Sequence, residues 1–241
     1  MAKLRIISDI HTEFHKDSGE SFSETLPDIP CDALVVAGDV GNSKTVLPFL
    51  RILCKRFRDT PVLYVPGNHE HYGTSIDQLR VDLASVRHSI PNLIHLDNTL
   101  VEIADVKIAG GTLWFPDEPF NKIYQHSMPD FRSIKGLDPQ VYTENRSTRL
   151  FLEHCGADVI VTHHLPCFEV VAPMWRGSNL NRFFVGADDA TVAAAKPKVW
   201  LFGHTHEPTD LTHLGVRMIA NPFGYPFESK GRFRDDLVVE V

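Results

Sequence analysis

The sequence contains a series of short apolar runs, each of which ends abruptly at a polar cluster. Runs of three to five residues that are rich in valine and isoleucine and bounded by turn-forming residues are typical of buried strands. They occupy residues 4–8, 33–37, 62–65, 159–161 and 199–202. We predict a buried strand at each of these places.

A segment with helical spacing lies between the predicted strands at 33–37 and 62–65. Between residues 46 and 57 the apolar residues recur at helical intervals, with Pro48 in the first turn. A strand, a helix and a further strand in this order form a unit in which the two strands run parallel. Further elements are predicted as helices over 76–86, 141–155 and 188–195, a hairpin over 100–103 and 106–113, and strands over 93–96, 216–219 and 237–241. The pattern is that of an α/β protein.

Two stretches lack a clear period. Residues 13–30 are mostly polar and are predicted to form an exposed connection. Residues from about 114 to 140 are rich in aromatic residues, proline and aspartate, and we interpret them as an insertion over one rim of the sheet. Because no repeat or linker divides the chain, a single domain over residues 1–241 is the simplest organisation.

The composition of the 241 residues is that of an ordinary globular protein, with 43% apolar and 23% charged residues. The formal net charge of −7 disfavours nucleic acid as a partner, because such affinity depends largely on Lys and Arg. Four cysteines without a CxxC pair are expected to be reduced thiols. No apolar stretch suits a signal peptide or a membrane span, so we expect a cytoplasmic protein without a membrane partner.

The polar clusters that follow the buried strands share one composition. Five strands end in Asp, Asn or His side chains, namely Asp9 with His11, Asp39, Asn68 with His69, His163, and His204 with His206. One histidine beside a strand is more often structural than a ligand, but burying so many polar groups together is costly unless coordination compensates. Two carboxylates, an amide and four imidazoles suit a pair of divalent ions such as Mn, Fe, Co, Ni or Zn.

In chain order these clusters read DxH, GD, GNHE, THH and GHTH, and they span residues 9–206. Each motif is short, but five motifs in order, each after a strand, form a strong signal. The chain therefore resembles the calcineurin-like metallophosphoesterase superfamily. The segments GGTLWFP at 110–116 and NPFGY at 221–225 resemble its small single-domain bacterial and phage members. The resemblance implies an α/β fold of two mixed β-sheets packed as a sandwich and flanked by helices.

The resemblance also implies roles for the site residues. One metal ion would be held by Asp9, His11, Asp39 and His206, and the second by Asp39, Asn68, His163 and His204. A water or hydroxide activated by the two ions would attack phosphorus, with Mn as the first choice of metal and Fe, Zn, Co or Ni as alternatives. His69 is not a ligand in the family pattern, and it is expected to donate a proton to the leaving oxygen.

The sequence departs from the pattern of the phosphoprotein phosphatases in this superfamily. Those enzymes carry GDxxD followed by Arg, whereas Asn42 and Ser43 stand at these positions here. Because Asn42 cannot hold a protonated imidazole as a carboxylate would, we expect His69 to be less strongly cationic. We therefore expect a small phosphorylated substrate, with a nucleotide among the candidates. A phosphodiester is slightly favoured, and the alternatives are a phosphomonoester or a non-catalytic scaffold that keeps the fold.

Three residues outside the motifs are candidates for contact with the substrate. Arg132 and Arg176 could clamp a phosphate, although a surface arginine is the simpler interpretation of each. Trp114 could stack on a nucleobase, although aromatic residues belong more often to the core. Within the GNHE motif, Glu70 is expected to orient a ligand or to cap a helix.

Overall fold

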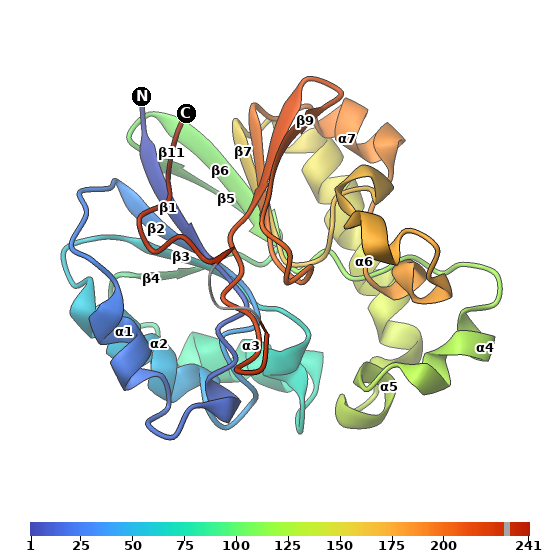
Figure 1. The fold of residues 1–241 in the computed structure, drawn as a ribbon, viewed down its shortest axis with the longest axis horizontal. Helices are drawn as coiled ribbons and strands as arrows, with labels where there is room; N and C mark the ends of the chain where they lie inside the picture. Colours follow the sequence, from blue (N-terminus) through green and yellow to red (C-terminus); the bar gives the residue numbers. More distant parts are fainter. Residues whose placement is uncertain (229–231) are drawn as a thin grey trace.

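The computed structural model describes residues 1–228 and 232–241, and two mixed β-sheets packed against each other form its centre (Figure 1). This is the sandwich that the resemblance implies. The strands of the first sheet are β1 (Lys3–Ile7), β2 (Ala33–Ala37), β3 (Val62–Val65), β4 (Leu93–His95) and β11 (Val238–Glu240). Among the described residues their order is β11-β1-β2-β3-β4, with β11 antiparallel to β1 and the other neighbours parallel.

The second sheet has parallel strands in its centre and an antiparallel strand at each edge. Its strands are β5 (Thr99–Ile103), β6 (Val106–Gly111), β7 (Val159–Thr162), β8 (Val199–Phe202), β9 (Thr209–His213) and β10 (Val216–Ala220). Their order in the described chain is β5-β6-β7-β8-β10-β9. Strands β6, β7, β8 and β10 run parallel, and β5 and β9 are antiparallel to their neighbours.

Helices cover the outer faces of both sheets (Figure 1). The helices are α1 (Glu20–Thr25), α2 (Val46–Arg56), α3 (Ile76–Val86), α4 (Asn121–Tyr124), α5 (Asp130–Ser133), α6 (Leu137–His154) and α7 (Asp189–Ala195). Strand β2 shows why the apolar runs do not alternate with polar residues. Leu34 and Val36 pack with Phe49 of α2, whereas Val35 packs with Val161 of the other sheet. Both faces are covered, so both need apolar residues.

The structure confirms most predicted strands and helices and corrects others. Residues 13–30 are not simply an exposed connection, because α1 lies within them. Phe22 of α1 and Leu26 directly after it are buried in the same cluster as Phe49. Helix α6 is assigned from Leu137, but Asp138 has non-helical backbone angles, so the regular helix begins after it, close to the predicted start at residue 141. The edge strand β9 was not predicted from the sequence, because its residues are only partly buried and largely polar.

The segment from 114 to 140 contains α4, α5 and the first residues of α6 (Figure 1). It contributes Trp114, Phe115 and Met128 to a buried cluster that also contains Val141 and Phe183. The assignment of this segment to an insertion, and of the whole chain to one domain, stays a prediction. None of the helices in the described part of the chain combines the length and the apolar character needed to cross a membrane.

Candidate metal centre

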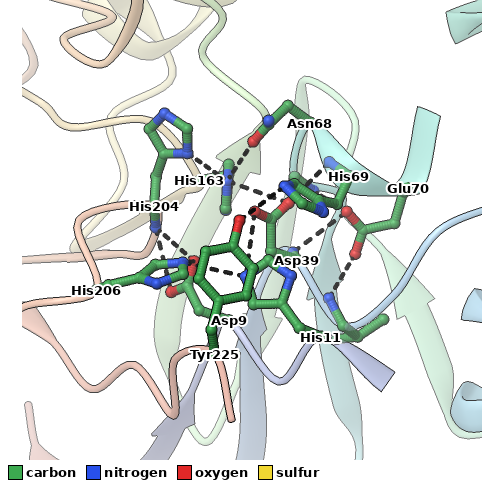
Figure 2. Close-up of polar contacts among 12 residues, drawn as sticks. Asp9, His11, Asp39, Asn68, His69, Glu70, His163, His204, His206 and Tyr225 are labelled. Carbon is green, nitrogen blue, oxygen red and sulfur yellow. Dashed lines mark hydrogen bonds and ion pairs between the residues drawn. The ribbon is translucent and has the colours of Figure 1, made fainter. Parts of the chain in front are cut away.

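The polar clusters after β1, β2, β3, β7 and β8 lie together at one edge of the two sheets, and their side chains point toward one another (Figure 2). The backbone turns sharply there. Five of the residues have left-handed backbone angles, with φ between 49° and 67°, namely Asp9, His11, Asp39, His204 and His206. Such angles cost roughly 1–2 kcal/mol per residue, and strain of this kind is concentrated at functional sites.

One group of donors consists of four residues whose donor atoms all lie within 4.8 Å of one another, namely Asp9, His11, Asp39 and His206. The Nε2 atoms of His11 and His206 are 3.0 Å apart. Nε2 of His206 lies 3.6 Å from Oδ1 of Asp9, and Nε2 of His11 lies 3.8 Å from Oδ2 of Asp39. The four side chains therefore present two imidazole nitrogens and two carboxylates to a common point.

A second group gathers on the other side of Asp39 and contains Asn68, His163 and His204. Nε2 of His163 lies 3.1 Å from Oδ1 of Asn68, 3.1 Å from Nδ1 of His204 and 3.4 Å from Oδ1 of Asp39. Asp39 therefore directs Oδ2 toward the first group and Oδ1 toward the second. This arrangement allows one carboxylate to bridge two cations.

The outer nitrogens of the histidines test whether the donors fit metal ions. In known sites a coordinating histidine usually gives its other ring N–H to a carboxylate or a carbonyl. Here Nδ1 of His163 faces the carbonyl oxygen of Ala37 at 2.9 Å. Nδ1 of His11 faces Glu13 at 3.1 Å, and Nδ1 of His206 faces Glu228 at 2.8 Å. With those N–H groups engaged, the neutral imidazoles of these three histidines keep their lone pairs on the inner nitrogens and fit divalent cations. Nε2 of the fourth, His204, is buried without a hydrogen-bond partner among the described residues.

The charge balance of the site points the same way. Burial lowers the pKa of His163, but the charge of Asp39 and a hydrogen bond to it outweigh burial and raise this pKa to about 9. Burial acts against ionisation of Asp39, yet the neighbouring His163 and His69 hold its pKa well below the ordinary value. Without a metal ion, protonation of His163 balances the buried carboxylate, and a metal ion would displace the proton on Nε2 when it binds.

Glu70 holds together the two turns that carry Asp39 and Asn68. Its fully buried carboxyl group accepts hydrogen bonds from the backbone N–H of Val40 at 2.8 Å and of Gly67 at 2.9 Å. It also accepts from the backbone N–H of Asp39 at 3.2 Å. Burial and the charge of Asp39 raise the pKa of Glu70 to about 8. Glu70 therefore orients a candidate ligand, one of the two roles predicted for it.

His69 lies beside both donor groups and lines the cavity above them. Its backbone N–H donates to Oδ1 of Asp39 at 2.9 Å, and its Nδ1 faces Oε1 of Glu13 at 2.8 Å. The other nitrogen, Nε2, is 3.2 Å from the hydroxyl oxygen of Tyr225 (Figure 2). Burial lowers the pKa of His69, but the charge of Asp39 and the bond to Glu13 outweigh burial and raise it to about 9.

The carboxylate that faces Nδ1 of His69 is Glu13 and does not come from the position of Asn42. That His69 is less cationic than its counterpart in the phosphoprotein phosphatases stays a prediction. The carboxylate comes from another part of the chain, since Glu13 lies two residues after His11. Its proximity to the DxH motif was the one available signal. Tyr225 lies in the NPFGY segment that was noted in the sequence, although no role was predicted for it.

Asp130 is a further residue that the sequence did not indicate. It is fully buried, and its Oδ1 accepts hydrogen bonds from Nδ2 of Asn68 at 2.8 Å and from the hydroxyl of Tyr72 at 2.7 Å. Because the amide nitrogen of Asn68 is engaged in this way, its amide oxygen turns toward His163. Asp130 lies in α5, far along the chain from the donors, and nothing in its sequence context marks it.

A cavity of about 670 Å³ opens beside the donors, and the three predicted substrate contacts do not line it. Trp114 is buried and packs near His164. Arg176 donates hydrogen bonds to the carbonyl oxygens of Val171 and Glu169 and to the Glu169 carboxylate. Its guanidinium group is therefore engaged by residues of its own loop. Arg132 is exposed on α5. The lining instead includes apolar residues such as Val171, Met174 and Trp175, which lie in the same loop as Arg176.

Two mixed sheets with carboxylate, amide and imidazole donors at their shared edge define the class of the metallophosphoesterases. The chain belongs to the calcineurin-like phosphoesterase family, whose sequence profile matches residues 2–208. This membership identifies it as a hydrolase of a family that uses divalent metals.

Individual relatives extend the comparison. The uncharacterized protein L509 of Acanthamoeba polyphaga mimivirus is 28% identical over 268 residues, which cover 95% of this chain and 93% of that protein. The acyl-carrier-protein phosphodiesterase PptH of Mycobacterium tuberculosis is 37% identical over 79 residues, 32% of this chain and 24% of that protein.

Solved structures share the fold. The crystal structure of PptH, a phosphopantetheinyl hydrolase, superposes with a TM-score of 0.71 at 22% identity and covers 93% of this chain and 90% of that one. The crystal structure of TT1561 of Thermus thermophilus has a TM-score of 0.58 at 16% identity, with 92% and 89% covered. At these identities the likeness concerns the fold alone.

Proposed function

We propose that the protein is a phosphodiesterase that depends on two divalent metal ions. The donors of one ion are Asp9, His11, Asp39 and His206, and those of the other are Asp39, Asn68, His163 and His204. The observation that carries the proposal is the position of Asp39 between two donor groups, with one carboxylate oxygen directed at each. The complete donor set also supports an enzyme over a scaffold that merely keeps the fold.

Two such ions would polarise the phosphoryl oxygens of an ester and lower the pKa of the attacking water. Residues of the protein then protonate the leaving group. Glu13 accepts the Nδ1 proton of His69, which leaves Nε2–H directed into the cavity toward Tyr225. His69 can thus pass the Nε2 proton to the leaving oxygen. We expect this proton transfer to contribute about 10²- to 10⁴-fold in rate.

Two observations support a diester over a monoester. A diester carries one negative charge near neutral pH where a monoester carries nearly two, and the cavity is lined by Glu207 and Glu228. Of the Lys and Arg residues, only Arg232 belongs to the described lining, and it is paired with Glu207. PptH, which is similar to part of this chain, is itself named a phosphodiesterase.

We propose manganese as the first cation to test and the cytoplasm as the compartment. The donor set contains no thiolate, which suits borderline metals. All four cysteines are free, namely Cys31, Cys54, Cys155 and Cys167, as in a reducing environment.

The proposal is tested with purified protein, Mn²⁺ and bis(4-nitrophenyl) phosphate, compared with 4-nitrophenyl phosphate as the monoester. We expect turnover that a chelator abolishes and a higher kcat/KM for the diester. His69→Ala should lose about 10²- to 10⁴-fold in kcat while its metal content is unchanged. His88→Ala, at an exposed histidine, is the matched control and should behave as the unmodified protein.

Three results would contradict parts of the proposal. Absence of turnover with Mn, Fe, Co, Ni and Zn would exclude the phosphoesterase activity. Preference for the monoester would reject the diester assignment. Full activity in His69→Ala would remove His69 from proton transfer.

A further inference from the structure

One wall of the cavity beside the candidate metal centre is apolar. The side chains of this wall come from the loops between β7 and α7. We call the part of the cavity that they line the apolar groove, and its residues are Leu165, Val171, Met174, Trp175, Leu180 and Phe184. Leu165 and Val171 are buried, whereas Met174 is 64% exposed and Trp175 is 56% exposed. Large apolar side chains gathered at the surface of a cavity commonly mark a ligand-binding site.

The apolar groove is continuous with the donor residues. The ring of Phe184 lies against the ring of His204, with centroids 4.4 Å apart. His204 also lines the cavity, so a molecule with its phosphate at the donor groups would meet Phe184 next. One end of the groove is therefore fixed at the place where the ester bond would lie.

The loop that carries Met174 and Trp175 is held in place by its own hydrogen bonds. The carbonyl oxygen of Trp175 accepts from Nδ2 of Asn181 at 2.8 Å and from the backbone N–H of Ser178 at 2.9 Å. The carbonyl oxygen of Val171 accepts from Nε of Arg176 at 3.1 Å. A wall formed in advance binds a ligand without the entropic cost of ordering the loop.

The charges around the cavity restrict the ligand further. Arg232 is the one Lys or Arg among the described lining residues, and Glu207 pairs with it. Glu228, a second carboxylate of the lining, faces His206 at 2.8 Å. A substrate with phosphates beyond the one being cleaved would therefore find no unpaired cationic side chain along the described wall.

We propose that one ester arm of the substrate is an uncharged, mainly apolar chain that lies along the apolar groove. This proposal rests on the phosphodiesterase function proposed above and narrows its substrates to singly charged diesters with such an arm. It disfavours compact hydrophilic esters and nucleoside polyphosphates. Phe184 and Leu165 would contact the part of the arm near the phosphate, and Met174 and Trp175 the remainder.

The test uses a series of alkyl 4-nitrophenyl phosphates, from methyl to hexyl, with Mn²⁺-loaded protein. The leaving group is constant, so kcat/KM reports the contribution of the alkyl arm. Burial of each methylene group should raise kcat/KM about two- to fourfold, which gives at least about 30-fold from methyl to hexyl. A 5-carboxypentyl ester of matching length should lose most of this gain, because its end is charged.

Variants locate the effect on the protein. Trp175→Ala should reduce the ratio of hexyl to methyl kcat/KM by about fivefold or more. Phe168→Ala is the matched control, because Phe168 lies in the same region and is 50% exposed but does not line the cavity. It should leave the ratio unchanged. Thermal melting of both variants verifies that the fold is intact.

The outcomes separate the two proposals. Turnover of all esters at rates that do not depend on chain length would contradict binding of the ester arm in the apolar groove, but not the phosphodiesterase activity. An unchanged ratio of hexyl to methyl kcat/KM in Trp175→Ala would lead to the same conclusion. Absence of turnover would refute the phosphodiesterase. In that case calorimetry with methyl and hexyl phosphonates still tests whether the apolar groove binds an alkyl chain. Equal affinity for the two compounds would contradict such binding.

Discussion

Replacing Glu13 by Gln tests whether one carboxylate controls the proton on His69. Oε1 of Glu13 lies 2.8 Å from Nδ1 of His69 and 3.1 Å from Nδ1 of His11. Gln keeps the length of the side chain and one oxygen acceptor, but it removes the negative charge. The substitution therefore isolates the electrostatic part of the contact.

The structure gives the size of the effect. Burial acts to raise the pKa of Glu13, but the hydrogen bonds from His11 and His69 outweigh it and lower this pKa from 4.5 to about 2. That difference corresponds to about 3 kcal/mol in favour of the carboxylate. This is the net difference after burial has opposed it, so an equal share for each histidine means that the charge of Glu13 raises the pKa of His69 by at least about one pH unit.

The sign of the pH effect follows directly. Glu13 raises the pKa of His69, so Glu13→Gln should lower it. A proton donor is active below its pKa, and the decline of kcat at high pH should therefore move about one unit toward lower pH. Above the original pKa of His69, kcat should be about tenfold below that of the unmodified protein, and below the lowered pKa it should change little.

The assay is a pH profile of kcat with bis(4-nitrophenyl) phosphate, accompanied by metal analysis because Glu13 also contacts His11. Glu20→Gln, at an exposed glutamate of α1, is the control and should keep the original profile. A profile in Glu13→Gln that coincides with that of the unmodified protein, at equal metal content, would refute the reasoning.

Three further predictions concern metal binding and stability. Asp39→Asn should weaken binding at both sites by more than about 100-fold in a calorimetric metal titration, and the loss of one site alone would contradict a bridging role. Gly67→Ala should lower metal content, because the added Cβ would collide with Oδ1 of Asp39, whereas Gly177→Ala meets no atom within 4 Å and should not. Trp200 is fully buried and donates to Oγ1 of Thr162 at 3.0 Å, so Trp200→Ala should lower the free energy of unfolding by about 3–5 kcal/mol. A loss below about 1 kcal/mol in urea denaturation would contradict this packing argument.

The sequence by itself determined the strands that carry the site and the residues that meet there. Each buried strand is a local run of apolar residues, and its polar cluster follows within a few positions, as with Asp39 after β2 and His204 after β8. Parallel strands bring their carboxyl ends to the same edge of a sheet. Local patterns were therefore enough to predict that Asp9, Asn68 and His163 lie close to these residues.

Only the tertiary structure decided which side chains surround the donors. Glu13 reaches His69, and Asp130 reaches Asn68, across 56 and 62 positions of the chain. Phe22 is buried although its neighbours are polar. These residues lie in irregular segments or short helices, where no period marks the inward face, and their partners depend on how distant loops fold back over the sheets. The same reason places Trp175, rather than Trp114, on the wall of the cavity.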